Sequence, residues 1–177
     1  YGAEMIKDEK VDMAYVGGAD GLSRSCFALF HRLGAMSPDF CRPFDKNRQG
    51  MMVSEGAGVL VLESLESALN RNAYIYAEII GHGLSCDAYH STAPHPEGLG
   101  ATLAMLKALK SANIKANEVS YISAHGTGTK ANDSTESKAL YRVFKEYTDR
   151  IPVSSLKSMI GHTMGAASGL EAISSVL

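Results

Sequence analysis

The sequence predicts an α/β protein with layers of helix and sheet, and three observations carry this prediction. Short apolar runs typical of buried strands alternate with segments of helical periodicity. The hydrophobic fraction of 45% and the charged fraction of 20% are ordinary for a globular protein. Residues capable of chemistry directly follow two of the predicted strands, where open α/β sheets place their ligands.

In the first half of the chain, strand signals surround one loop. A buried apolar run ends in a glycine pair, which favours a turn, and a later segment containing Pro38, Pro43 and Gly50 favours a loop. The elements expected here are a strand over 11–18, a loop over 37–50, a strand over 58–63, a short helix over 65–71 and a long strand over 74–84.

In the second half, a proline-containing loop precedes an amphipathic helix with apolar residues at helical spacing. Asp133 followed by Glu136 three residues later is typical of a capping box that starts a further helix. The expected elements are a loop over 85–99, a helix over 99–112, a strand over 118–124, a helix over 134–144, a strand over 151–155 and a final helix from about residue 165.

Composition and charge argue against several classes of protein. The net charge is −2, and no basic stripe indicates a nucleic-acid partner. No apolar run approaches the roughly 18 residues of a membrane span. Three cysteines without CxxC spacing (Cys26, Cys41 and Cys86) argue against a disulfide framework or zinc knuckle and favour a reducing compartment. No metal site is expected.

Both ends of the sequence indicate a piece of a longer protein. The chain begins at Tyr1 without an initiator methionine or signal peptide, and it stops at Leu177 within an apolar helical pattern. The run 42–48 is the best candidate for a boundary between two halves. We therefore expect one half to end at residue 45 and the other to occupy 46–177.

His125 and the residues after it are the first candidate site. A histidine at a strand end is most often structural, but His125 is followed by Gly-Thr-Gly-Thr. Glycines let backbone approach a ligand closely. The hydroxyls of Thr127 and Thr129 could bond to the carbonyl or amide groups of an extended substrate arm.

Lys157 and His162 are the second candidate site. Lys157 follows an apolar strand, so its stem should be buried and its ammonium needs a partner, for which Glu136 is the nearest candidate by residue type. His162 follows Gly161 and precedes a helix rich in small residues. The surrounding sequence matches neither GxGxxG nor the P-loop pattern, so nucleotide binding is not expected.

Together these motifs resemble the β-ketoacyl-acyl-carrier-protein synthases, the condensing enzymes of fatty acid and polyketide synthesis, most closely the elongating type II branch. The resemblance spans essentially the whole chain in family order. The matching residues are Arg42-Pro43-Phe44-Asp45, Glu55-Gly56-Ala57-Gly58, Ser85-Cys86-Asp87-Ala88-Tyr89-His90, His125-Gly126-Thr127-Gly128-Thr129 with Asp133 and Glu136, Ser155-Leu156-Lys157-Ser158, and Gly161-His162 with Gly165-Ala166-Ala167.

The resemblance implies a thiolase-like fold of layered α-β-α-β-α type, built from two similar halves and normally dimeric. The chain would cover the end of the N-terminal half (1–45) and a truncated C-terminal half (46–177). It also implies a reaction. An acyl group is loaded onto a cysteine, malonyl-carrier protein loses carbon dioxide, and the resulting carbanion attacks the acyl thioester.

The resemblance implies roles for particular residues. They are a catalytic group of His125, His162 and Lys157, a substrate- and pantetheine-binding group of Thr127, Thr129 and, more weakly, Thr92, and two acidic residues behind the catalytic groups, Asp133 and Glu136. No cofactor is expected on the chain, since its substrates are carried on the phosphopantetheine of acyl carrier protein. The implied partners are acyl carrier protein, malonyl and acyl thioesters, and a second subunit in a homodimer or heterodimer. The implied location is cytoplasmic, or a plastid or mitochondrial matrix in a eukaryote.

The sequence departs from the family at the nucleophile. The family's cysteine would lie upstream of Tyr1, and neither Cys26, Cys41 nor Cys86 lies in the required strand-to-helix turn, so the chain alone should be inactive. Two alternatives remain. One is a non-catalytic chain-length-factor partner. The retained histidines and lysine argue against it, and the identity of the residue at the upstream nucleophile position would distinguish it from the enzyme. The other is a thiolase, in which no equivalent of Lys157 is expected.

Overall fold

The computed structural model describes residues 1–177 and divides into two compact units. The first unit comprises 1–23, 54–79 and 163–177, and the second comprises 24–53 and 80–162. Each unit is therefore assembled from segments distant in sequence. The division of the chain into halves at residue 45 stays a prediction.

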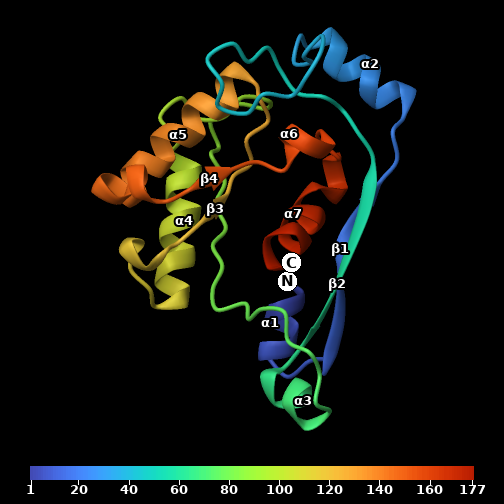
Figure 1. Ribbon diagram of the computed structural model, residues 1–177, viewed down its shortest axis with the longest axis vertical. Coiled ribbons are helices and arrows are strands. Elements are labelled where there is room, and N and C mark those ends of the chain that lie inside the picture. Colours follow the sequence, from blue (N-terminus) through green and yellow to red (C-terminus); the bar gives the residue numbers. More distant parts are fainter. The chain divides into compact units, whose positions relative to one another are not determined.

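The first unit is built on an antiparallel pair of strands, β1 (Met13–Asp20) and β2 (Gly56–Glu63), drawn in blue and teal in Figure 1. Helices α1 (Gly2–Lys7) and α7 (Ala167–Val176) and the 3₁₀ turn η3 (Met164–Ala166) pack against this pair. Gly58 permits a close approach to α7, because a Cβ there would lie 3.0 Å from Cδ1 of Ile173. Helix α3 (Leu65–Asn70) follows β2 and begins where the Ser64 hydroxyl accepts a hydrogen bond from the Ser67 amide.

The second unit contains a β–α–β crossover. Strand β3 (Ile122–Ser123) pairs in parallel with β4 (Val153–Ser154), and helix α5 (Lys130–Phe144) lies between them in sequence. Its core consists of Leu140, Val143, Phe144 and Ile151, with side chains of α4 (Leu99–Ala112) packed against it. The remaining elements are α2 (Arg24–Arg32), α6 (Lys157–Ile160) and the 3₁₀ turns η1 (Ala116–Glu118) and η2 (Lys145–Arg150).

Most of the expected elements are present. The helix over 99–112 is confirmed at both ends, and the strands expected over 11–18 and 58–63 correspond to β1 and β2. The strands leading to His125 and Lys157 belong to one sheet, as expected, although each is only two residues long. Helices α1 and α2 were not anticipated from the sequence.

Two expectations are wrong. Residues 74–84 form no strand, because no other segment of the chain pairs with them. At its end this run packs instead against α4, where Lys107 Nζ donates to the Leu84 carbonyl at 2.8 Å. The helix expected from residue 134 begins at Lys130, one turn earlier, and its N-cap is Thr129 instead of Asp133.

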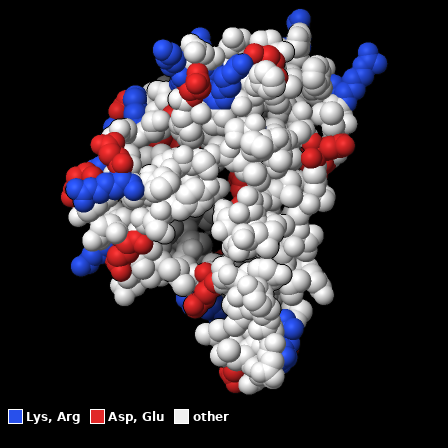
Figure 2. Space-filling view, in the orientation of Figure 1, with Lys and Arg blue, Asp and Glu red and all other residues white.

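The helices and the surface add two observations. None of the helices has both the length and the apolar character needed to cross a membrane. On the face shown in Figure 2, acidic and basic side chains are interspersed and no large patch of one sign forms.

Candidate active site

The two histidines and the lysine come together within the second unit. His125 follows β3 with Ala124 between them, and Lys157 begins α6 shortly after β4. The rings of His125 and His162 lie edge to face, with centroids 5.4 Å apart and planes at 86°. The His162 amide donates to the Met52 carbonyl at 2.6 Å, which fixes the backbone on which this second ring is carried.

Lys157 is buried against His125. The lysine is 1% exposed, its Nζ donates to the His125 carbonyl at 2.8 Å, and Nζ lies 3.4 Å from Nδ1 of the His125 ring. The expected pairing with Glu136 is wrong, because the carboxylate oxygens of Glu136 are bonded to other groups. Lys157 therefore places a positive charge directly beside the His125 ring.

Glu136 holds the backbone of the loop 125–129, which we call the histidine loop. Its Oε1 accepts from the His125 amide at 2.7 Å, and its Oε2 accepts from the Gly126 amide at 2.8 Å. The expected capping box is thus wrong, since the carboxylate reaches back to the loop before the helix instead of to the helix N-cap. Charge-assisted bonds of this kind are stronger than neutral ones and fix the peptide that carries His125.

Asp133 holds the other end of the histidine loop. This side chain is 1% exposed and accepts from the Gly128 amide at 3.1 Å and from the Phe44 amide at 2.7 Å. Arg48 Nε lies 3.5 Å from Oδ2 of Asp133, so the buried carboxylate has a cationic partner. Asp133 therefore ties the loop 42–48 to the histidine loop.

Thr127 and Thr129 lie in the middle of this arrangement. Their hydroxyl oxygens are 2.9 Å apart, and the Thr129 hydroxyl also caps α5. Gly128 has φ +76° and packs closely on Gly50, whose carbonyl oxygen would lie 2.6 Å from a Cβ at this position. A side chain at residue 128 would therefore displace the threonine pair.

Thr92 is not brought into this cluster by any hydrogen bond. Its amide donates to Nδ1 of His90 at 3.1 Å, and its hydroxyl lies 3.5 Å from the same nitrogen. Both contacts stay within the loop 85–98, which we call the proline loop. The structure thus places Thr92 in a locally ordered turn and supplies no contact with the histidines or with the threonine pair.

The surroundings of His162 favour its neutral form. Burial of the ring is the largest cause that lowers the pKa of His162 to about 4, and the positive charges of Lys157 and His125 lower it further. At neutral pH this ring therefore carries one N–H donor and one acceptor nitrogen. It can donate a hydrogen bond without carrying a charge.

Cys41 is a buried thiol that lacks the character of a nucleophile. Burial raises the pKa of the Cys41 thiol, and its Sγ donates to the Thr127 carbonyl at 3.4 Å. A reactive cysteine requires the opposite shift, towards the thiolate. Cys26 and Cys86 form no disulfide bond. These observations support the expectation that the nucleophile lies elsewhere.

Sequence reasoning missed two residues that support the site. The Ser155 hydroxyl donates to the Gly126 carbonyl at 2.9 Å, and Arg48 Nε lies 3.4 Å from the Thr129 carbonyl. Ser155 could have been found from its place at a strand end, two positions before Lys157. Arg48 could have been found from its place in the loop 42–48, which carries part of the resemblance.

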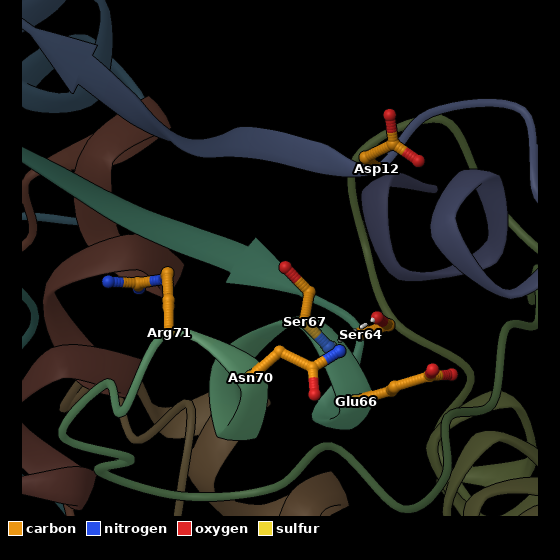
Figure 3. Close-up of a pocket in the computed structure, with 6 residues that line it drawn as sticks. All are labelled: Asp12, Ser64, Glu66, Ser67, Asn70 and Arg71. Atoms are coloured by element: carbon orange, nitrogen blue, oxygen red, sulfur yellow. Dashed lines mark hydrogen bonds between the residues drawn. The ribbon is translucent and has the colours of Figure 1, made fainter.

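A shallow cavity of about 450 Å³ lies in the first unit, at the end of β2 and around α3 (Figure 3). None of the predicted site residues lines it. Two of its lining side chains are bonded locally, because the Ser67 hydroxyl and the Arg71 guanidinium both donate to Glu63. The residues around the cavity are Asp12, Ser64, Glu66, Ser67, Asn70 and Arg71.

Known proteins resemble this chain closely. The β-ketoacyl synthase C-terminal domain matches residues 76–177, and the N-terminal domain of the same family matches residues 2–68. A protein of Staphylococcus aureus named 3-oxoacyl-[acyl-carrier-protein] synthase 2 is 53% identical over 180 residues, which cover 98% of this chain and 45% of that protein.

Solved structures agree with this result. The ishigamide ketosynthase/chain length factor matches with a TM-score of 0.94 and 54% identity, over 100% of this chain and 43% of that one. A type II polyketide synthase acyl-carrier protein in complex with its ketosynthase, bound to the hexaketide, matches with a TM-score of 0.95 and 37% identity, over 99% of this chain and 45% of that one.

The chain thus spans less than half the length of these relatives. The likeness covers both units and confirms the predicted thiolase-like α/β fold. The chain belongs to the β-ketoacyl synthase family.

Proposed function

We propose that this chain supplies the histidine and lysine groups of a β-ketoacyl-acyl-carrier-protein synthase. The reaction is the decarboxylative condensation of malonyl-carrier protein with an acyl thioester, in fatty acid or polyketide chain elongation. The observation that carries the proposal is the pair of rings, His125 and His162, 5.4 Å apart beside the buried ammonium of Lys157.

The proposed chemistry uses the two rings as hydrogen-bond donors. When the carbon–carbon bond of malonyl thioester breaks, carbon dioxide leaves and the electron pair gives an enolate with negative charge on the thioester oxygen. Preorganised donors stabilise such a charge. His162 is suited to this task because its pKa of about 4 keeps the ring neutral, with an N–H to donate, at physiological pH.

His125 and Lys157 complete the site in this proposal. The ammonium of Lys157 lies 3.4 Å from Nδ1 of His125 and also donates to the His125 carbonyl, so it orients the ring that faces His162. The enolate carbon then attacks the acyl thioester carbonyl, the carbon–sulfur bond breaks, and the cysteine thiolate leaves. In this proposal the cysteine belongs to the remainder of the synthase.

The substrates would arrive on the phosphopantetheine arm of acyl carrier protein. Thr127 and Thr129 supply two adjacent hydroxyls that can bond to the amides of such an arm, and Thr92 is a further proposed contact. The polyketide relative described above is a complex of a ketosynthase with an acyl-carrier protein, which supports this partner. We further propose a dimer acting in the cytoplasm, or in an organelle matrix in a eukaryote.

A chain-length-factor partner remains the second candidate, because one similar structure contains both a ketosynthase and a chain length factor. The cluster of His125, Lys157 and His162 favours the enzyme. A subunit without chemistry has no need of a buried ammonium beside two facing rings, since burying a charge is costly.

The test uses the full-length synthase that contains this sequence. His125→Ala and His162→Ala should each lower carbon dioxide release from malonyl-carrier protein by about 10²–10³-fold, while acyl loading of the nucleophile persists. Lys157→Ala should slow both half-reactions, because it removes a buried positive charge from the site as well as the contact that orients His125. His31→Ala, which changes an exposed histidine of α2, is the matched control and should retain both activities. Wild-type carbon dioxide release in both histidine variants would refute the assigned roles.

The chain by itself provides a second test. Incubated with acyl- and malonyl-carrier protein, it should form no acyl-enzyme and no condensation product, because the thiolate that attacks must have a lowered pKa and that of Cys41 is raised. Mass spectrometry would detect an acylated cysteine. Acylation of Cys26, Cys41 or Cys86 would show that the nucleophile has been misplaced.

A further inference from the structure

We propose that Asn132 is a positioning residue of the condensing site, acting through Glu136 on the backbone of His125. The inference rests on the proposed function, because the reaction affected is malonyl decarboxylation. Asn132 lies in the first turn of α5 and contacts neither histidine ring through the bonds of its side-chain amide. Its effect must therefore pass through its neighbours.

The side-chain nitrogen of Asn132 lies between two carboxylates. Nδ2 donates to Oδ1 of Asp133 at 3.2 Å and to Oε2 of Glu136 at 3.1 Å. An amide nitrogen carries two hydrogens, so this single group supplies one donor to each carboxylate. The same two oxygens also accept from the Gly128 and Gly126 amides. Asn132 thus connects the two carboxylates that hold the histidine loop.

Electrostatics explains why a donor is needed at this place. The carboxylates of Asp133 and Glu136 both lie within 3.2 Å of Nδ2 of Asn132, and their negative charges repel each other. Water screens this repulsion poorly, because the Asp133 side chain is only 1% exposed. Arg48 offsets the charge of Asp133 from another direction, at 3.5 Å. Asn132 faces both carboxylates, so it keeps Glu136 in the rotamer that accepts the hydrogen bond from the His125 amide.

The backbone of Asn132 serves a separate part of the site. Its amide donates to the Thr129 hydroxyl at 3.3 Å, and that hydroxyl lies 2.9 Å from the Thr127 hydroxyl. Any substitution at residue 132 other than proline keeps this amide. Side-chain variants should therefore leave the proposed pantetheine contacts intact while loosening the peptide that carries His125.

Three variants of the full-length synthase separate these effects. In Asn132→Leu the new side chain has a volume similar to that of asparagine but no hydrogen-bond donor. This variant should lower kcat for carbon dioxide release about tenfold, with little change in KM or acyl loading. Asn132→Asp adds a third carboxylate and should lower kcat about 100-fold. Asn132→Gln keeps the donor on a longer stem and should recover part of the activity lost in Asn132→Leu. Asn70→Leu, an exposed helical asparagine of α3, is the matched control and should behave as the wild type.

Amide hydrogen exchange tests the positioning without using activity. In Asn132→Leu the amides of His125 and Gly126 should exchange about tenfold faster, while the amide of Asn132 itself stays protected. Unchanged exchange at His125 together with wild-type kcat would overturn the proposal. Equal losses of acyl loading and carbon dioxide release would also overturn it, since that pattern indicates a structural role only.

The two proposals fail in different ways. If the wild-type synthase released no carbon dioxide from malonyl-carrier protein, the proposed function would be wrong. The exchange rates at His125 and Gly126 would still decide whether Asn132 holds the loop through Glu136.

Discussion

The histidine loop and the proline loop are held by the same kind of bond in different surroundings. In the histidine loop, Glu136 and Asp133 each accept hydrogen bonds from two backbone amides. In the proline loop, Asp87 does the same, accepting from the His95 amide at 2.8 Å and from the Gly100 amide at 2.9 Å. Each carboxylate gives one oxygen to each amide.

The difference lies in burial. Asp133 is buried to 1% exposure, whereas Asp87 is exposed to solvent. Water competes for the oxygens of an exposed carboxylate and screens its charge, so the same geometry contributes less to stability. The same pattern of hydrogen bonds can therefore contribute different amounts to stability, depending on how deeply the carboxylate is buried.

Asp133→Ala should lower the free energy of unfolding by about 3 kcal/mol, because two amides and the Arg48 guanidinium lose their acceptor in a buried place. Urea unfolding of the protein measures this change. Asp133→Asn keeps one acceptor oxygen and should lose less. A loss of unfolding free energy below about 1 kcal/mol in Asp133→Ala would mean that burial does not make the bonds of the histidine loop more stabilising than those of the proline loop.

His162 should make stability depend on pH. Its folded-state pKa of about 4 lies below the ordinary value of 6.5, so between these values the unfolded chain binds a proton that the folded protein does not. Stability should be unaffected by this group above pH 6.5, should fall as the pH drops towards 4, and should level off below. The total loss is at most about 3 kcal/mol.

The measurement for His162 is a series of urea midpoints between pH 7 and pH 4. His162→Asn should abolish the fall of the urea midpoint with pH that is due to His162, and His90→Asn in the exposed proline loop should leave that fall unchanged. Parallel profiles for the wild type and His162→Asn would contradict the neutral state assigned to the buried ring.

Glu136→Gln should affect activity more than stability. A glutamine keeps one acceptor for the His125 or Gly126 amide but turns a donor group towards the other. In the full-length synthase we expect carbon dioxide release to fall about tenfold, because the catalytic peptide is misplaced. Asp87→Asn is the matched control, and similar losses in both variants would remove the distinction between the loops.

Asp87→Ala should have the smallest effect. Loss of two bonds to an exposed carboxylate should lower the free energy of unfolding by less than about 1 kcal/mol. The local consequence should be clearer than the global one, with faster amide exchange at His95 and Gly100. A loss as large as that of Asp133→Ala would indicate that the proline loop is as firmly built as the histidine loop.

The sequence predicts those elements that are defined by local patterns. The helix over 99–112 is correct at both ends because apolar periodicity marks its body, and residues with positive φ, Gly98 and Asn113, flank it. The meeting of His125 and Lys157 was also predictable, since both follow strands of one parallel pair.

The sequence does not reveal how the acidic side chains are used. Asp133 and Glu136 have the spacing of a capping box, yet both reach back to amides of the preceding loop, a choice decided by the turn that Gly126 and Gly128 permit. The run 74–84 has the composition of a strand, but pairing requires a partner strand, which is a long-range property. Thr92 is predicted from the resemblance alone, and the hydrogen bonds of its loop leave that prediction untested.

The shortness of β3 and β4 has a consequence for folding kinetics. Between Ser123 and Val153 the chain must close a loop of roughly 30 residues, which costs roughly 3 kcal/mol of entropy. So short a pair forms few backbone bonds, among them those from the Ile122 amide to the Pro152 carbonyl and from the Ala124 amide to the Ser154 carbonyl, and each contributes only about 1 kcal/mol. The strands therefore cannot nucleate by themselves, and they should form only as Leu140, Val143, Phe144 and Ile151 come together. Mutations in that apolar cluster should slow refolding, whereas mutations in the histidine loop should mainly speed unfolding.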